Sequence, residues 1–432
     1  MAVRSRVTLD YREADQLQTG AVCGGGNVRC FAHVLATEDG FVSPAAPTTG
    51  FTPTDLQSAY KIPTAIGGTP LVAIIDAYGY ANLESDLAMY RSTFGLPPCT
   101  TNNGCLHIVN QEGNNSPLPA QAPSSDDWTI ETALDVDMAS AACPKCKILV
   151  VQADDDTGTG LYVAQNTAAS LGAAVISNSW GGPERAGLSL DANEAYFAHD
   201  DTVAIFVSAG DAGFNDAGEG PDYPGTSAHV IAVGGTHLSR DTSTRGWSET
   251  AWEDGGSACS LSIAKPAYQS GSGCSFKATT DIAAVGDPQT GVAVYHAGNG
   301  GWTVVGGTSA AAPLVAAMWA ATGNGRHTSG EYIKQNTAKL WDVTSGSNGA
   351  CGSILCTAGI GWDGPTGYGT PNAAQWVTAA VTGDGGETET SDDDDANVIG
   401  GCSASGSGSG LLLVSLVLVR GCKRRGTASR RA

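Results

Sequence analysis

Four polar side chains stand in settings where they could perform nucleophilic and acid-base chemistry, and the first is a serine. Ser309 lies in VVGGTSAAAP (304–313), after two glycines and before the apolar run LVAAMWAA, which predicts a buried helix that begins near the serine. A serine in that place can cap the helix, or it can attack an electrophile whose developing negative charge the helix N-terminus stabilises. Ser309 is therefore a candidate nucleophile, with N-capping as the alternative.

Two carboxylates, Glu131 and Asp135, lie four residues apart in DDWTIETALDVDMASAAC. On a helix this spacing suggests that they share one face and can share a proton. The alternative is a solvated acidic helix end, because Asp126 and Asp127 come just upstream and carboxylates suit the N-terminal end of the helix dipole.

A further carboxylate, Asp211, follows an apolar strand pattern in VSAGDAG, where an Asx-turn is the ordinary explanation. A serine nucleophile needs a base, and none of the seven histidines lies in a His-Gly-Thr motif. Glu131 can be that base if it ionises near pH 4, close to its ordinary pKa of about 4.3, with Asp135 orienting it and accepting the shared proton. Asp211 could stabilise an oxyanion only as a neutral acid. We therefore expect activity confined to acid pH, with apparent pKa values that belong to the coupled carboxylates.

The elements that must position these groups follow from hydrophobic patterning. Apolar runs such as LVAIIDAY (71–78), ILVVQA (148–153), AAVISNS (173–179), VAIFVSAG (203–210) and HVIAVGG (229–235) alternate with helical patterns at 84–94, 161–172 and 191–200. This alternation predicts an α/β fold with a mostly parallel central sheet and helices on both faces. Sites in such sheets lie at the carboxyl ends of strands, where the loops SNSWGG, SAGDAG and VGGTS are expected.

The overall composition indicates a globular protein with an acidic surface. Of the 432 residues, 41% are hydrophobic and 15% are charged, and the net charge is −21. The acidic balance disfavours nucleic acid and anionic membranes as partners, so nucleic-acid binding is the least favoured function class.

Ten of the twelve cysteines form close pairs in the sequence, which predicts local disulfides and an oxidising compartment. The pairs are Cys23 with Cys30, Cys99 with Cys105, Cys143 with Cys146, Cys259 with Cys274, and Cys351 with Cys356. The CPKC motif at 143–146 could instead be a redox dithiol or half of a zinc site, but no second C-x-x-C completes such a site.

The two ends of the chain differ from its middle. The first residues hold no apolar core of signal-peptide length, so the cysteines imply that the given start lies downstream of a signal peptide and leader. Residues 379–400 are expected to be an acidic linker. Residues 401–432 combine a Gly-Cys motif, an apolar run (411–419) too short to span a membrane, and an arginine cluster. That order resembles myxobacterial-type C-terminal sorting tails, with Cys402 as the expected point of processing, whereas the alternative is a loose cationic tail.

Between these ends, the chain resembles the sedolisin family, the serine-carboxyl peptidases with a subtilisin-like fold, across about residues 50 to 378. The matching motifs in order are FTPTDLQSAYKIP, ETALD, SNSWGGPE, SAGDAG, YPGTSAHVIAVGGT, ETAWEDGGSACS, DPQTGVAVY, GGTSAAAP, and DVTSG with AGIGWDGPTGYGTPN. The resemblance implies a peptidase domain over 51–378. It makes Ser309 the nucleophile, Glu131 the general base, Asp135 its support and Asp211 the oxyanion acid.

The resemblance also implies a binding strand and a metal. It makes Ser179, Trp180 and Gly181 the segment that pairs with the backbone of the substrate. The alternative for Trp180 is simple packing under that loop. It further implies one structural Ca²⁺ ion bound by hard oxygen ligands. These would be the carboxylates of Asp342 and Asp363 and the main-chain carbonyls of Val343, Gly359 and Gly361.

The family resemblance leaves some features open. Sedolisins are made with a long prosegment, whereas only residues 1–50 precede the domain here, and 21–46 resemble the end of such a leader. Asp76 lies near the position of a subtilisin-triad aspartate, but the sedolisin pattern assigns it only a structural role.

The expected function is that of a secreted or cell-surface acid endopeptidase. We expect it to be a monomer that acts on proteins and peptides and has a possible cell-envelope attachment through its tail. The alternatives are a neutral subtilisin-like protease that uses Asp76, and a catalytically silent surface or binding protein that keeps the fold.

Overall fold

The computed structural model describes residues 18–24, 28–37, 40–41, 49–64, 68–124, 126–184, 190–199 and 202–378. The chain divides into two units, residues 1–383 and 384–432, and every described residue belongs to the first. The predicted acidic linker (379–400) and tail (401–432), including Cys402, lie outside the described residues. Within the described part of the chain, no helix is both long and apolar enough to cross a membrane.

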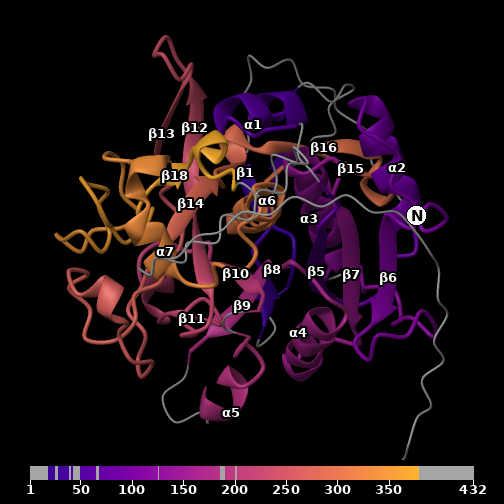
Figure 1. Cartoon of the computed structure of the whole chain (residues 1–432), viewed down its shortest axis with the longest axis horizontal. Helices are drawn as coiled ribbons and strands as arrows, with labels where there is room; N and C mark the ends of the chain where they lie inside the picture. Colours follow the sequence, from indigo (N-terminus) through magenta and orange to yellow (C-terminus); the bar gives the residue numbers. More distant parts are fainter. Residues whose placement is uncertain are drawn as a thin grey trace, which may run out of the picture. The chain divides into compact units, whose positions relative to one another are not determined.

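The largest sheet has the strand order β13-β12-β10-β8-β5-β7-β6, and β14 also pairs with β12. Most of these strands can be followed across the middle of Figure 1. Their pairings are parallel except for the antiparallel pair of β12 and β13. The strands are β5 (Leu71–Ala77), β6 (Leu106–Asn110), β7 (Lys147–Ala153), β8 (Val175–Asn178), β10 (Ala204–Ser208), β12 (Ile231–Arg240), β13 (Trp247–Ala251) and β14 (Ile282–Val285). The prediction of a mostly parallel sheet is confirmed.

The helices lie around this sheet. They are α1 (Pro53–Ala59), α2 (Leu83–Thr93), α3 (Trp128–Ala142), α4 (Thr159–Ser170), α5 (Leu190–Glu194), α6 (Thr308–Ala321) and α7 (Gly330–Gln335). The α3 and α6 helices pack against each other, α3 contacts β5, and α6 contacts β8, β10, β12 and β14. Every residue of α3 and of α6 is buried, so both helices lie inside the core, and the carboxylates of α3 are buried with it.

One predicted helix is shorter than expected. The pattern at 191–200 predicts a helix over ten residues, but α5 ends at Glu194. Phe197 is fully buried, with its ring against those of Tyr162 and Tyr223. Tertiary packing of this aromatic side chain therefore overrides the local helical pattern.

Residues near the N-terminus form strands in two smaller sheets. One sheet has the order β1 (Gln18–Ala21), β3 (His33–Thr37), β16 (Gly301–Gly306) and β15 (Val292–His296), and β4 (Gly40–Phe41) pairs with β3. The other has the order β11 (Asp222–Tyr223), β9 (Trp180–Pro183) and β2 (Arg29–Cys30). The leader-like segment thus adds strands to elements that come from the middle and end of the domain.

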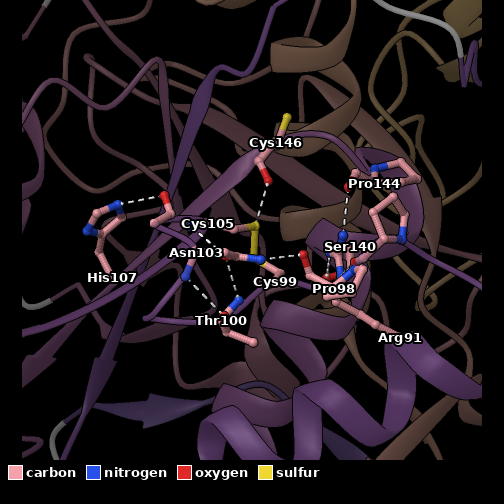
Figure 2. The surroundings of a disulfide bond; sticks show 12 residues. Arg91, Pro98, Cys99, Thr100, Asn103, Cys105, His107, Ser140, Pro144 and Cys146 are labelled. Atoms are coloured by element: carbon pink, nitrogen blue, oxygen red, sulfur yellow. Dashed lines mark hydrogen bonds between the residues drawn. A yellow bond between two sulfur atoms is a disulfide. The ribbon is translucent and has the colours of Figure 1, made fainter.

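Five disulfides among the described residues join the pairs expected from the sequence, including Cys143 with Cys146. Figure 2 shows the surroundings of Cys99–Cys105, just before β6, where Asn103 accepts a hydrogen bond from the main-chain N–H of Cys105. Each bond joins residues at most 15 positions apart, so the disulfides fasten local loops.

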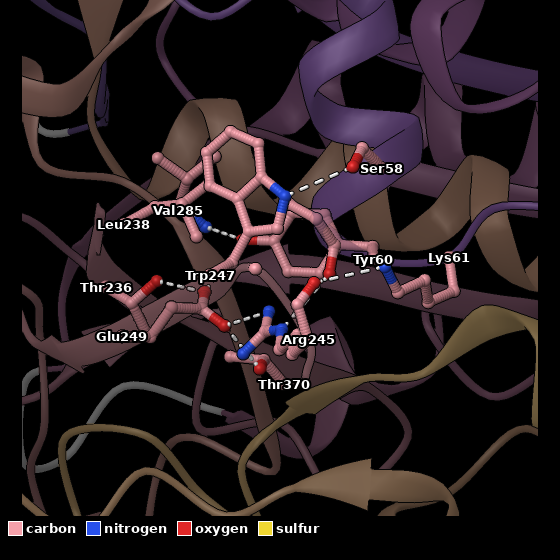
Figure 3. Close-up of polar contacts among 12 residues, drawn as sticks. Ser58, Tyr60, Lys61, Thr236, Leu238, Arg245, Trp247, Glu249, Val285 and Thr370 are labelled. Atoms are coloured by element: carbon pink, nitrogen blue, oxygen red, sulfur yellow. Dashed lines mark hydrogen bonds and ion pairs between the residues drawn. The ribbon is translucent and has the colours of Figure 1, made fainter. Parts of the chain in front are cut away.

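A buried carboxylate joins four parts of the fold near α1 (Figure 3). Glu249 of β13 accepts hydrogen bonds from the hydroxyls of Tyr60, Thr236 and Thr370 and from the guanidinium of Arg245. The Tyr60 hydroxyl in turn accepts a hydrogen bond from the main-chain N–H of β14. The network therefore links the end of α1, the β12–β13 hairpin, β14 and the short strand β18 (Thr370–Pro371), which pairs with β17 (Leu340–Trp341).

Candidate active site

The candidate nucleophile lies where the sequence places it, at the start of a buried helix. Ser309 is the second residue of α6, and the N-cap is Gly307, whose φ of 102° is readily adopted only by glycine. The Ser309 hydroxyl does not cap the helix but donates to the main-chain carbonyl of Ser179 at 3.2 Å. The N-capping alternative is therefore wrong, and the hydroxyl points toward the loop after β8.

The two carboxylates of α3 face the same buried space as this serine. Glu131 and Asp135 are both completely buried, so the alternative of a solvated acidic helix end is wrong. Asp127 instead serves as the N-cap, and its side chain accepts from the main-chain N–H of Thr129. Asp135 accepts a hydrogen bond at 2.9 Å from the hydroxyl of Ser179, the residue whose carbonyl binds Ser309. The loop after β8 thus bridges the serine and the carboxylates.

Burial changes the acid-base behaviour of this cluster. Burial raises the pKa of Glu131 well above its ordinary value, the charge of Asp76 raises it further, and the side chains of Ser309 and Asp135 lower it. The pKa of Asp135 is likewise raised by burial and by Asp76 and Glu131. The assumption that Glu131 keeps its ordinary pKa is therefore wrong, because removal from water disfavours its charged form. Burial therefore favours the protonated forms of both carboxylates in the folded protein.

A third carboxylate, Asp76, joins the pair, although the family pattern assigned it only a structural role. It is fully buried at the end of β5, and neither oxygen has a hydrogen-bond partner among the described residues. Burial raises its pKa to about 7. Its place at the carboxyl end of a buried strand was the sequence signal that could have identified it. Asp76 contributes to the electrostatics of Glu131 as well as to the packing.

The fourth candidate, Asp211, faces the serine from the loop after β10. Its Oδ1 atom accepts two hydrogen bonds from Thr308, from the main-chain N–H at 2.8 Å and from the hydroxyl at 2.7 Å, so the local Asx-turn is not its role. Its Oδ2 atom is buried and has no hydrogen bond within the described part of the chain, and Nε2 of His33 lies 3.5 Å from it. Burial raises the pKa of Asp211 well above its ordinary value. A neutral acid with a free oxygen beside Ser309 can donate to an oxyanion.

The strand expected to hold a substrate already pairs with an extended segment. In β9, Trp180 lies opposite Cys30 and Gly181 opposite Arg29 in antiparallel register, and the carbonyl of Ser179 accepts from the N–H of Phe31 at 3.1 Å. The indole of Trp180 is itself fully buried and donates to the carbonyl of Ile75. The main chain of this strand therefore pairs with an extended segment, whereas the Trp180 side chain packs beneath it.

A disulfide lies against the candidate base, Glu131. The sulfur atoms of Cys23 and Cys30 and a carboxylate oxygen of Glu131 all lie within 4.8 Å of one another. Both sulfurs are bonded to each other, so they are not thiolates and this group is not a metal site.

The loop predicted to bind calcium gathers hard oxygen atoms. The carboxylate of Asp342 accepts from the N–H of Gly361, and that of Asp363 accepts from the N–H of Gly359. Burial raises the pKa of Asp363 to about 6, and the neighbouring charge of Asp342 adds to this. No described residue donates a hydrogen bond to the carbonyls of Val343, Gly359 or Gly361. Two neighbouring carboxylates and three free carbonyls fit the oxygen ligands that calcium prefers.

The mostly parallel sheet, with a serine at the start of a buried central helix, defines the subtilisin-like α/β class. Residues 108–358, more than half of the chain, match the model of the subtilase family, and the chain belongs to this family.

Two curated proteins and one solved structure are similar to this chain over most of its length. Kumamolisin of Bacillus sp. (strain MN-32) is 32% identical over 78% of this chain and 65% of its own length, and sedolisin of Pseudomonas sp. (strain 101) is 29% identical over 77% and 61%. The chain thus spans less than two thirds of the length of these curated relatives. The solved structure of Pseudomonas sedolisin, a serine-carboxyl proteinase complexed with pseudo-iodotyrostatin, is similar with a TM-score of 0.64 and 28% identity, over 76% of this chain and 96% of that one.

Proposed function

We propose that this protein is an acid-acting serine-carboxyl endopeptidase that hydrolyses peptide bonds of proteins through an acyl-enzyme on Ser309. One observation carries the proposal. Ser309 of α6, Glu131 and Asp135 of α3, and Asp211 after β10 converge around the strand that pairs with an extended peptide. The similarity to relatives named as serine-carboxyl proteinases supports the same conclusion.

Each of the four side chains has a separate role in the proposed reaction. Glu131 takes the proton of the Ser309 hydroxyl as its oxygen bonds to the carbonyl carbon of the substrate, and Asp135 accepts part of the shared charge. Neutral Asp211 donates its Oδ2 proton in a hydrogen bond to the carbonyl oxygen as that oxygen becomes negative. The proton held by Glu131 then passes to the leaving amine as the C–N bond breaks. Water next attacks the acyl carbon and loses its proton to Glu131. The bond between that carbon and the Ser309 oxygen then breaks, Glu131 returns the proton to this oxygen, and the acid product leaves.

The raised pKa values set the expected pH range. Glu131 must lose its proton to act as a base, and Asp211 must keep its proton to act as an acid. The rate should therefore rise as the carboxylate cluster ionises and fall as Asp211 ionises, in a bell-shaped profile whose two pKa values belong to coupled groups. Peptidase activity on the acidic side of neutrality is the expected result.

The decisive experiment measures hydrolysis of a denatured protein and of an internally quenched peptide between about pH 3 and pH 8. It compares the wild type with Ser309→Ala, Glu131→Ala and Glu131→Gln. Activity confined to acid pH and lost in all three variants supports the serine-carboxyl mechanism. An optimum at neutral pH would favour a subtilisin-like neutral protease that uses Asp76, and inactivity of a correctly folded wild type would favour a silent binding protein.

We also propose one structural Ca²⁺ ion in the loop at Asp342 and Asp363. These carboxylates and the carbonyls of Val343, Gly359 and Gly361 would hold it. When bound, the ion neutralises the repulsion between the two carboxylates and fixes the glycine-rich loop after Cys356 to the strand that precedes Asp342.

The proposed setting is outside the cell. Five local disulfides support an oxidising compartment, and a net charge of −21 argues against nucleic acid as a partner. We infer a secreted or cell-surface monomer whose residues 401–432 act as a sorting tail with Cys402 as the modified residue. Detection of the protein in the outer membrane or culture medium, with and without residues 401–432, tests this inference.

A further inference from the structure

The N-terminal segment described at residues 18–24 and 28–37, here called the leader segment, passes through the candidate active site. Its β2 strand pairs with β9 in the antiparallel manner of a bound peptide, and Phe31 continues that pairing through Ser179. The next strand of the segment, β3, pairs with β16 on the other side of the site, with His33 opposite Gly306. The chain between these strands therefore crosses directly over the start of α6.

The carbonyl group of Phe31 lies close to Gly307 and to Asp211, the proposed oxyanion donor. A Cβ atom added to Gly307 would lie 1.8 Å from the carbonyl oxygen of Phe31 and 2.6 Å from Oδ2 of Asp211. The two oxygens are thus neighbours, and Oδ2 is the atom of Asp211 that makes no hydrogen bond among the described residues. The carbonyl carbon at this position is the one that Ser309 would attack, so the peptide bond presented to the serine is Phe31–Ala32.

Side-chain contacts anchor the residues before this bond. The guanidinium of Arg29 lies 2.7 Å from Asp216 and 3.7 Å from Asp222. The ring of Phe31 is 2% exposed and lies so close to Gly181 that a Cβ there would be 2.9 Å from its edge. The sulfur of Cys30 lies against Glu131. The leader segment thus fills the site with a charged anchor, a buried aromatic ring and a disulfide.

Both sides of the Phe31–Ala32 bond are tied to the same strand. On the amine side, the carbonyl of Ala32 accepts from the N–H of Val22 at 3.0 Å, and β3 pairs with β1 in a register that places His33 opposite Ala21. On the acyl side, the disulfide joins Cys30 to Cys23, just after β1. Cleavage between Phe31 and Ala32 would leave both new ends attached to β1, within reach of each other.

We propose that the leader segment is a disulfide-braced inhibitor of its own active site, with Phe31–Ala32 as a reactive bond that is cut slowly because its ends cannot separate. The inference rests on the proposed function. In the forward step the Ser309 oxygen bonds to the Phe31 carbonyl carbon, the bond to the Ala32 nitrogen breaks, and the serine proton passes through Glu131 to that nitrogen. While β1 holds the amine in place, it can lose that proton to Glu131 and attack the ester, which restores the peptide bond and competes with hydrolysis by water.

If the Cys23–Cys30 disulfide holds the two ends together, its removal should change the rate of cleavage at Phe31–Ala32. A leader that only blocks the site would show no such dependence on this disulfide. With the Cys23–Cys30 disulfide removed, the acyl side gains freedom, the ends separate and hydrolysis becomes irreversible. The double variant Cys23→Ser/Cys30→Ser should therefore be cut at Phe31–Ala32 at least about tenfold faster than the wild type, because preorganisation of the loop is lost. The matched control is Cys99→Ser/Cys105→Ser, which removes a disulfide of nearly equal loop length, with a sequence separation of 6 against 7, before β6.

The experiment incubates the full chain at acid pH and follows the new N-terminus at Ala32 by mass spectrometry, together with hydrolysis of an added quenched peptide. Faster cutting and faster onset of peptide hydrolysis in the Cys23/Cys30 variant alone support the proposal. Equal rates in the two disulfide variants would overturn the brace, and a first cut at any bond other than Phe31–Ala32 would overturn the assigned register.

A second measurement separates this inference from the proposed function. In Ser309→Ala protein, which cannot cut itself by the proposed mechanism, amide hydrogen exchange at Phe31, whose N–H donates to the carbonyl of Ser179, reports whether the leader segment is bound. Protection that falls when Cys23 and Cys30 are replaced, but not when Cys99 and Cys105 are replaced, supports the braced docking independently of catalysis. No protection in any variant would overturn it. Absence of peptide hydrolysis in every folded variant would overturn the proposed function and the cleavage step together.

Discussion

Thr308 holds the carboxyl group of Asp211 with two hydrogen bonds to the same oxygen, Oδ1, at 2.8 Å from its main-chain N–H and 2.7 Å from its hydroxyl. This arrangement leaves Oδ2 free at the place where an oxyanion would form. The residue before Ser309 thus orients the proposed acid, and the orientation can be tested at both Thr308 and Asp211.

Replacement of Asp211 by alanine should lower kcat by about 10²–10³, because it removes a preorganised donor to the oxyanion. Asp211→Asn keeps an N–H donor that does not titrate, so it should lose less activity and should extend the remaining activity to higher pH. Thr308→Val removes only the hydrogen bond from the hydroxyl, so its kcat should lie between those of the wild type and Asp211→Ala. The measurement is kcat as a function of pH for each variant. An unchanged alkaline limb in Asp211→Asn would show that another group sets that limb.

Asp76 should make the folded protein less stable as pH rises. Its folded-state pKa of about 7 lies above the ordinary value of 3.8, so its contribution is fully present below about pH 4 and is lost as pH rises toward 7. The shift corresponds to a loss on the order of 2–4 kcal/mol across that window. Asp76→Asn, which stays neutral, should flatten the pH dependence of the unfolding free energy measured by urea denaturation.

The matched control for Asp76 is Asp154→Asn, since Asp154 is an exposed carboxylate just after β7. It should leave the slope of stability against pH unchanged. A wild-type protein whose stability rises steadily from pH 4 to pH 7 would contradict the prediction, because that sign requires carboxylates with lowered pKa values.

Removal of calcium should lower the melting temperature, and this test requires no substitution at the candidate active-site residues. At a calcium concentration 100 times the dissociation constant, the ion would add about 2.7 kcal/mol to stability. A chelator should therefore lower Tm in the wild type, and Asp363→Asn should lower Tm and abolish the response to added calcium. Asp154→Asn should respond to calcium like the wild type. Equal Tm values with chelator and with calcium in the wild type would argue against the site.

The Glu249 network of Figure 3 should contribute to stability and not to chemistry. Its buried carboxylate binds the partly buried guanidinium of Arg245 at 2.6 Å, with side-chain exposures of 1% and 11% respectively. Glu249→Ala leaves that cation and three hydroxyls without their acceptor and should cost about 3–5 kcal/mol of unfolding free energy. Glu249→Gln retains hydrogen-bonding capacity and should cost less. A loss below about 1 kcal/mol in the alanine variant, the range of exposed ion pairs, would contradict the assigned burial.

Local sequence patterns determined much of the fold because they depend on neighbouring residues. The apolar runs at β5, β7, β8, β10 and β12 and the buried helix after Gly307 reflect periodicity and turn chemistry, and they agree with the structure. The short loops between paired cysteines likewise indicated the correct disulfides. The predicted length of the helix at 191–200 was wrong, because the burial of Phe197 depends on aromatic rings that are distant in the sequence.

For the candidate site, the sequence by itself determined the residue types, their order and the spacing of Glu131 and Asp135. Only the tertiary structure decided which charges share one buried volume. It added Asp76 to the carboxylates and raised their pKa values, since removal of a group from water depends on every element packed around it. It also decided that Phe31 lies beside Ser179 and that Cys30 lies against Glu131. Such contacts join residues more than 100 positions apart, and no local pattern encodes them.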